Sequence, residues 1–176
     1  MRSLIFAILL VSSPAFALTQ SDFAMGVGLE SRMQRDVNPD YSNPRSSGNL
    51  YAKLRMRPWD LLIETARDEQ STGSGSLRIR NESTLLAAWA RYEFEKNESW
   101  TPYVSLGAGN YFDKVSTTFQ ASHVESNGNR KFLGLSAGIS AVFWDHFLVE
   151  GEARVLSLEQ SKDPVLSGLI RVGCQM

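Results

Sequence analysis

The segment Leu133–Phe143 reads LGLSAGISAVF and carries the pattern that decides the fold. Alternate residues are apolar, at Leu133, Leu135, Ala137, Ile139, Ala141 and Phe143. The residues between them are small or polar, at Gly134, Ser136, Gly138 and Ser140. Successive side chains of a β-strand point to opposite faces, so this period of two predicts a strand with one apolar face.

The same period recurs on both sides of this segment. It predicts seven further strands, at residues 23–35, 50–57, 61–66, 86–94, 103–112, 149–155 and 169–176. Each predicted strand has one apolar face, and its other face is polar, charged or glycine. We therefore expect an all-β fold of eight antiparallel strands in up-and-down order. A soluble β-sandwich also alternates, so the period alone does not say which face points to the centre.

The lengths of the predicted connections favour a transmembrane barrel. Three are long and rich in Asn, Ser, Gly and Pro, at residues 36–48, 68–76 and 113–131. Two are short and two are of medium length, at 58–60, 144–146, 95–101 and 158–164. Outer-membrane barrels have short periplasmic turns and longer outer loops. We therefore expect an eight-stranded transmembrane β-barrel with short periplasmic turns.

Aromatic residues gather at the short and medium connections on one side of the predicted barrel. They are Trp59, Trp100, Tyr103, Trp144 and Phe147. Trp and Tyr prefer the boundary between lipid and water. We expect these side chains to form the periplasmic aromatic girdle. In the alternative, the three tryptophans are unrelated surface or core residues, which would leave their shared position at alternate connections unexplained.

The faces opposite the apolar ones carry charges of both signs. They are Glu30, Arg32, Lys53, Arg55, Arg57, Glu64, Arg91, Glu93, Glu150, Glu152, Arg154 and Arg171. An Arg or Lys facing lipid costs about 2–4 kcal/mol at the midplane, whereas side chains can fill the lumen of an eight-stranded barrel. We expect these residues to point inward as a lumen charge network. In the alternative, a soluble periplasmic lipocalin-like carrier, the apolar faces would line a ligand cavity and the charges would face water.

In one predicted strand, the alternation does not decide which residues face the lipid. Arg78, Arg80 and Glu82 have the same parity as the lipid-facing Leu86 and Ala88. Either a bulge near residues 81–83 switches the phase, or this part of the strand projects above the membrane, where charge costs little.

The first 17 residues have the features of a cleavable signal peptide. Arg2 precedes the apolar run Leu4–Val11, and Ala15-Phe16-Ala17 supplies a small-x-small cleavage site. The run is too short for a spanning helix, which needs roughly 20 apolar residues. We expect export with cleavage after Ala17, which leaves residues 18–176 as the barrel domain.

The remaining composition argues against several classes of function. The net charge of −1 gives no basic surface for nucleic acid. The single cysteine, Cys174, excludes an internal disulfide and is expected to behave as a small apolar side chain. Residues 71–76, STGSGS, lack the lysine and the helix of a phosphate-binding loop. No metal cluster is present in the sequence, so neither a metal nor another cofactor is expected.

Three segments resemble strands of the OmpA/OmpX-type small outer-membrane barrels. They are Thr101–Gly109 (TPYVSLGAG), Leu133–Ile139 (LGLSAGI) and Val149–Arg154 (VEGEAR). The resemblance implies a location in the bacterial outer membrane, contact with its lipid and lipopolysaccharide, and insertion by the barrel-assembly machinery. Members of that family usually end in an aromatic residue, whereas this chain ends in Gln175-Met176.

Loops on a rigid scaffold usually carry binding, so the longest connection, 113–131, is the expected place of recognition of an extracellular ligand. A filled lumen predicts a structural or surface-recognition role without an open pore. The enzyme alternative is a lipid A-modifying barrel, with candidates His123, Glu125 and Ser126. In outer-membrane lipid A deacylases the His and Ser lie two apart on a strand, whereas here they lie three apart in a predicted loop. We therefore assign no catalytic residue.

Overall fold

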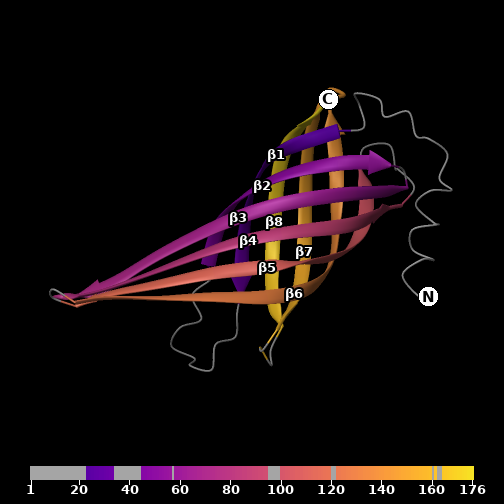
Figure 1. Ribbon diagram of the computed structural model, residues 1–176. Coiled ribbons are helices and arrows are strands. Elements are labelled where there is room, and N and C mark those ends of the chain that lie inside the picture. The colour runs from indigo at the N-terminus through magenta and orange to yellow at the C-terminus, as the bar shows by residue number, and fades with distance from the viewer. Residues whose placement is uncertain are drawn as a thin grey trace, which may run out of the picture.

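The computed structural model describes residues 23–33, 45–56, 58–94, 100–119, 122–159, 161 and 164–176. The strands are β1 (Phe23–Met33), β2 (Arg45–Met56), β3 (Trp59–Ser74), β4 (Leu77–Glu93), β5 (Thr101–Phe119), β6 (Ser122–Phe143), β7 (Phe147–Leu158) and β8 (Val165–Gln175). Each strand pairs antiparallel with the next, and β1 pairs with β8, so the sheet closes into a barrel (Figure 1). The eight-stranded antiparallel barrel expected from the sequence is confirmed. The expected leader, residues 1–17, lies outside the described residues.

The alternation along each strand separates an apolar outer wall from a polar lumen. In β6, Leu133, Leu135 and Ile139 are 65%, 62% and 53% exposed, whereas the intervening Ser136 and Ser140 are buried. This polarity is the opposite of that required by a lipocalin-like carrier, whose lumen would be apolar. Within the described ranges, no helix is long and apolar enough to cross a membrane.

The four central strands are longer than a membrane wall requires. β3, β4, β5 and β6 have 16, 17, 19 and 22 residues, whereas the other four have 11 or 12. A transmembrane strand needs about 9–11 residues. The surplus ends form a four-stranded sheet that projects from the barrel, away from the C-terminus (Figure 1). We call residues 67–84, 113–119 and 122–131 the extension.

The prediction of long loops is therefore wrong for two of the three segments. Residues 68–76 and 113–131 belong mainly to the hairpins β3–β4 and β5–β6. The turn between β3 and β4 needs only Gly75 and Ser76, and Gly75 adopts a left-handed φ of 62°. The prediction failed because strands surrounded by water are rich in Ser, Thr and Asn, which is also the composition of loops.

The register of β4 shows which face of the sheet its charged residues occupy. The β3–β4 pairing runs without a slip from Trp59↔Tyr92 to Ser74↔Leu77. The β4–β5 pairing is equally regular up to Leu77↔Phe119. There is no bulge in this part of β4, so its charged residues keep the parity of the lipid-facing ones and lie in the extension.

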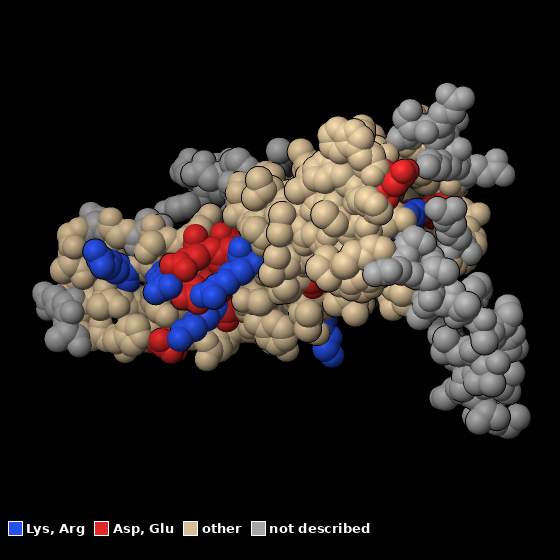
Figure 2. All heavy atoms as spheres, turned by 90° about the horizontal axis from the view of Figure 1, so that it is seen from above, with Lys and Arg blue, Asp and Glu red and all other residues tan. Residues whose placement is uncertain are grey.

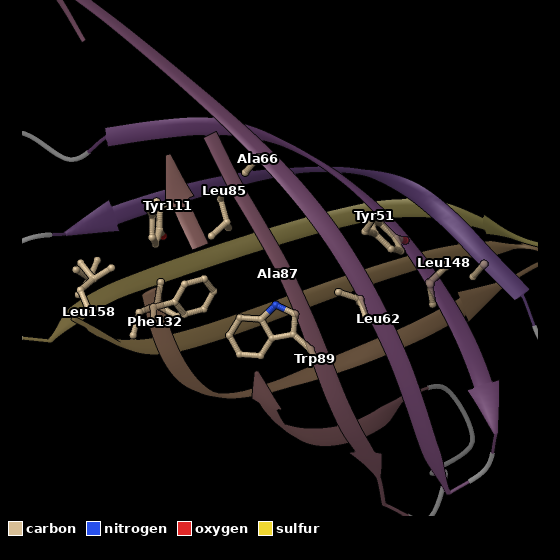
Figure 3. Close-up of a cluster of buried hydrophobic side chains, with 13 residues drawn as sticks. Tyr51, Leu62, Ala66, Leu85, Ala87, Trp89, Tyr111, Phe132, Leu148 and Leu158 are labelled. Atoms are coloured by element: carbon tan, nitrogen blue, oxygen red, sulfur yellow. The ribbon is translucent and has the colours of Figure 1, made fainter. Parts of the chain in front are cut away.

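Aromatic side chains fill the lumen by lying against glycines of neighbouring strands. A Cβ on Gly107 would come within 2.3 Å of the Trp89 ring, and one on Gly134 within 2.7 Å. Trp89 also packs with Phe132, whose ring centroid is 6.2 Å away (Figure 3). Tyr51 lies in the same way against Gly26 and Gly173. Glycine on the inner face thus makes room for a large ring from the adjacent strand.

The substitution Gly107→Val should destabilise the barrel, because the added side chain overlaps the Trp89 ring. We expect a loss of about 1–3 kcal/mol in the free energy of unfolding, the usual cost of overpacking a core. Urea unfolding of the purified barrel in lipid vesicles measures it. Gly168→Val is the matched control, since a Cβ on Gly168 meets nothing within 4 Å. Equal losses for the two variants would contradict the packing described.

Candidate functional site

A group of buried charges occupies the middle of the lumen. This central cluster consists of Lys53, Glu64, Arg91, Glu150, Glu152, Arg154 and Arg171. Its members come from β2, β3, β4, β7 and β8, and none is more than 7% exposed. The strands therefore bring together charges that are far apart in the sequence.

Glu64 shows how completely a buried carboxylate is satisfied here. It accepts two hydrogen bonds from Arg154 and one of 2.6 Å from Arg171. The indole of Trp89 donates to the same carboxylate at 2.8 Å, and the amide of Asn49 donates at 3.0 Å. A buried carboxylate is tolerated only with such a set of donors.

Glu150 and Glu152 complete the central cluster on β7. Glu150 pairs with Lys53 at 2.8 Å and with Arg91. Glu152 pairs with Arg154 and with Arg171, each at 2.6 Å. The hydroxyl of Tyr103 also donates to Glu152, at 3.0 Å. The three carboxylates and four cations thus form one connected network across the lumen.

Each guanidinium of the central cluster also lies over an aromatic ring. The distances from guanidinium carbon to ring centroid are 3.7 Å for Arg91 over Tyr103 and 4.4 Å for Arg154 over Trp89. Arg171 lies 5.4 Å from the centroid of Tyr51. These cation–π contacts fix the planes of the arginines, whose edges then donate to the carboxylates.

The other expected members of the lumen charge network lie above and below the central cluster. Arg32 pairs with Glu30 at 2.8 Å, and Arg55 pairs with Glu93 at 2.9 Å. Arg57 lies outside the described residues. Sequence reasoning missed Asp60, which is buried 3.6 Å from the ammonium of Lys53. Asp60 is four residues from Glu64 and therefore faces the same side of the strand, which is the signal that identifies it. The sequence analysis instead places Asp60 in the connection 58–60.

Apolar side chains close the lumen toward the extension. The buried cluster there includes Leu85, Tyr111, Phe132, Leu158 and Val165 (Figure 3). The Phe132↔Leu158 pair is the last one between β6 and β7. The charge network is therefore covered at this end by a layer that excludes water.

Four of the five aromatics expected in the girdle are exposed at the end of the barrel opposite the extension. Trp59, Trp100, Trp144 and Phe147 lie on the outside, and Trp144 is 86% exposed. Tyr103 is a correction: it is 1% exposed and points into the lumen. Its parity with the inward-facing Ser105 on β5 decides its direction, and closeness to a turn does not.

Trp144 occupies an unfavourable backbone conformation. The turn Phe143–His146 is closed by the amide of His146 donating to the Phe143 carbonyl at 3.3 Å. Both central residues have positive φ, 50° for Trp144 and 64° for Asp145. A positive φ favours Gly, Asn or Asp over other residues. A bulky aromatic is therefore held here at a cost in backbone energy.

The outer face of the extension carries a compact patch of ion pairs. Figure 2 shows these acidic and basic side chains together, beside an almost uncharged barrel wall. Arg80 pairs with Glu69 at 2.9 Å and with Glu82 at 3.0 Å. Lys114 pairs with Glu125 at 3.0 Å. Hydrogen bonds from Lys114 and from His123 hold the pKa of the Glu125 carboxyl below its usual value.

The residues of the enzyme alternative are not arranged as a hydrolase site. His123 lies 3.1 Å from Thr118 Oγ1 and 3.1 Å from Glu125 Oε1, on the exposed charged face. Ser126 differs from His123 in parity along β6, so its side chain points to the opposite face of the sheet. A nucleophile must reach its base, and this pair does not.

The inner face of the extension carries an apolar patch near its end. This tip patch consists of the exposed Leu77, Val115, Phe119 and Val124 and the half-buried Ile79, which come from β4, β5 and β6. Phe119 is 50% exposed and Val124 is 65% exposed. At the tip the polarity is the reverse of that in the barrel, because the apolar side chains are on the inner face, whereas the inner face nearer the barrel carries the Asp113–Arg130 ion pair. Among the described residues, no group of three or more His, Cys, Asp or Glu side chains could hold a metal ion.

Comparison with known proteins agrees with this architecture. The family model for an outer membrane protein beta-barrel domain matches residues 3–168. No curated protein sequence matches the chain. Among solved structures, neisserial surface protein A (NspA) has a TM-score of 0.60 and 18% identity, over 88% of this chain and 97% of that one.

Two further solved structures share the fold. Ail of Yersinia pestis, determined in complex with the heparin analogue sucrose octasulfate, has a TM-score of 0.55 and 15% identity, over 86% of this chain and 94% of that one. The N-terminal barrel of OprF from Pseudomonas aeruginosa has a TM-score of 0.55 and 12% identity, over 86% and 96%. At these identities the likeness concerns the fold alone.

The substitution Glu64→Gln should destabilise the barrel strongly, because Arg154 and Arg171 each lose one of their carboxylate partners and the buried cluster is left with more uncompensated positive charge. Removing one partner of a buried ion pair costs about 3–5 kcal/mol. The matched control is Glu82→Gln in the extension, where exposed pairs contribute about 0–1 kcal/mol. Equilibrium unfolding in urea compares the two free energies. A loss at Glu64 no larger than that at Glu82 would show that the central cluster does not stabilise the fold.

Proposed function

The chain belongs to the outer membrane protein beta-barrel domain family, and from that premise we propose that it is a surface-recognition protein of the bacterial outer membrane. The barrel is the anchor, and the extension is the binding element. The observation that carries the proposal is the continuation of β3–β6 beyond the wall as an ordered, two-faced sheet. A structural protein that only filled the membrane would not need strands of this length.

The extension offers a protein partner two means of attachment. Its tip patch is an exposed apolar surface, and such patches mark interaction sites. One of its two edge strands, β6, pairs only with β5 beyond Lys131 among the described residues, so residues 122–130 present a free edge. An extended segment can add to such an edge through main-chain hydrogen bonds. A protein surface with an apolar strand fits both features.

A sulfated polysaccharide fits the extension less well, although Ail was crystallised with a heparin analogue. Two cations of the charged face are neutralised by their neighbours: Arg80 lies between Glu69 and Glu82, and Lys114 faces Glu125. A polyanion would have to displace these carboxylates. The proposal therefore assigns binding to the tip patch.

The lumen supports an anchoring role without a porin-type pore. The central cluster and the apolar layer fill the space that a solute would need. An eight-stranded barrel is just wide enough to be filled by its own side chains. Neither the lumen nor the exposed His123 is assigned a catalytic role.

The remaining parts of the proposal concern export and placement. Residues 1–17 would direct export and be removed after Ala17, and the barrel-assembly machinery would insert the rest beside lipopolysaccharide. Trp59, Trp100, Trp144 and Phe147 would form the girdle at the periplasmic boundary. The exposed Trp144 supports this, since an interfacial role explains why an aromatic is kept at a position with positive φ.

Placement can be tested by labelling single cysteines on intact cells with a membrane-impermeant maleimide. In a Cys174→Ser background, the Ser71→Cys variant should be labelled, because position 71 lies in the extension outside the cell. The Asp145→Cys variant should be labelled only after the outer membrane is permeabilised. The reverse pattern would contradict the proposed orientation.

Recognition can be tested by the attachment of bacteria that express the protein and no other adhesin to epithelial monolayers. The double variant Phe119→Ser, Val124→Ser should attach at least several-fold less, because the tip patch loses its apolar surface. The matched control is Thr118→Ser, His123→Ser, whose positions are adjacent but on the charged face. Unchanged attachment of the tip-patch variant would contradict the proposal. A loss confined to the control, with reduced binding to heparin-coated beads, would assign the function to the charged face.

A further inference from the structure

The outer wall is hollowed where the extension leaves the barrel. The last pair between β6 and β7 is Phe132↔Leu158, and a hollow of about 660 Å³ lies on the wall there. We call this hollow, which is bordered by β5, β6 and the end of β7, the wall notch. In the proposed orientation, with the extension outside the cell, the wall notch lies in the outer leaflet of the membrane.

The lining of the wall notch has two levels. Ala108 and Leu133 form an apolar lower level, and Leu133 is 65% exposed. Asn110, Lys131 and Glu159 form a polar upper level, which we call the rim. Asn110 and Lys131 are directly opposite each other across β5 and β6. An amphiphile in the wall notch would therefore place its acyl chain on the lower level and its headgroup at the rim.

The two charges of the rim are adjacent but not paired. The backbone amide of Glu159 donates to the carbonyl of Lys131 at 2.8 Å, so the two residues are neighbours. Among the residues that the structure describes, however, neither side chain forms an ion pair. Lys114, farther out on β5, is by contrast paired with Glu125 at 3.0 Å. The rim therefore presents one cation and one anion to a ligand.

We propose that the wall notch binds a phosphate group of a phosphorylated outer-leaflet glycolipid, of the lipid A class, together with one divalent cation. The phosphate lies between Lys131 and Asn110. The divalent cation lies between this phosphate and the carboxylate of Glu159, because Mg²⁺ in proteins is usually held by one or two carboxylates together with ligand phosphates and water. One acyl chain of the glycolipid runs down the wall over Leu133 and Ala108.

The charge balance at the rim favours a phosphate monoester, the form that lipid A carries. A monoester has between about −1.5 and −2 charges near neutral pH. Its charge, that of Glu159, that of Lys131 and that of one divalent cation therefore nearly cancel. The phosphate diester of a glycerophospholipid has a single charge, so it leaves the same rim with an excess positive charge. The inference rests on the proposed placement of the extension outside the cell, but it does not depend on recognition by the tip patch.

Native mass spectrometry of the purified barrel, in a nonionic detergent with magnesium acetate, tests the phosphate site. The probes are lipid A, lipid A from which the phosphates have been removed, and dioleoyl phosphatidylglycerol. We expect one lipid A per chain, retained about tenfold more strongly than either other probe, since one hydrogen bond to a charged group is worth about this factor. Lys131→Gln should weaken retention of lipid A by a similar factor.

Replacing magnesium by EDTA tests the divalent cation. Retention of lipid A by the unsubstituted protein should fall about tenfold in EDTA, because the Glu159 carboxylate then faces the phosphate without a bridging cation. Glu159→Gln should retain lipid A equally in the two media. The matched controls are Lys114→Gln and Glu69→Gln, which remove exterior charges outside the wall notch and should behave as the unsubstituted protein does. Heat-modified migration on gels confirms that each variant is folded.

Three results would overturn the proposal. Lipid A might be retained no better than its dephosphorylated form or than phosphatidylglycerol, which would exclude a phosphate monoester site. EDTA could weaken retention as much in Glu159→Gln as in the unsubstituted protein, which would exclude the bridging cation. Equal losses in Lys114→Gln and Lys131→Gln would show that exterior charge in general holds the lipid. None of these results changes the expected outcome of the cysteine labelling or of the attachment assay, so the site and the proposed function can fail separately.

Discussion

The burial of charge inside a narrow lumen is the interaction on which the rest of the structure depends. Lipid outside forbids charged side chains on the wall, so every charge on a membrane strand must point inward. Taking an ion out of water costs several kcal/mol, which only close partners can offset. The network among Glu64, Glu150, Glu152 and their four cations meets that requirement. It also joins β2, β3, β4, β7 and β8 across the barrel.

The glycine and aromatic positions follow from the same constraint. A guanidinium donates well only when its plane is held, and each arginine of the central cluster is held by a ring: Arg91 by Tyr103, Arg154 by Trp89 and Arg171 by Tyr51. Each ring needs space, which is provided by an inward-facing glycine on a neighbouring strand. In the lumen, an inward-facing glycine thus makes room for an aromatic ring, the ring holds an arginine, and the arginine pairs with a glutamate. These side chains fill the middle of the lumen, and the proposal therefore places recognition in the extension.

The sequence predicts the part of the fold that lipid constrains. Alternation between lipid and lumen gives eight strands and the inward direction of residues such as Lys53 and Glu150, because a shift of one position would expose a charge to lipid. The extension is not under that constraint, so its strands read as loops. Tyr103 and Asp60 show a second limit. Each was assigned by its distance from a turn, although its parity within the strand decides that both face the lumen.

The unequal strand lengths explain the free edge of the extension. β6 has 22 residues and β7 has 12, so β6 must continue without a partner on one side. Above their last pair, the Glu159 amide still donates to the Lys131 carbonyl, and the free edge of β6 begins beyond that residue. Exposed edges invite aggregation unless charge guards them. Glu125 and Arg130 lie on this edge and are paired within the extension, so an added strand must accommodate these ion pairs as well as supply backbone hydrogen bonds. The same residues that keep the edge free in the absence of a partner therefore set the chemistry that a partner must have.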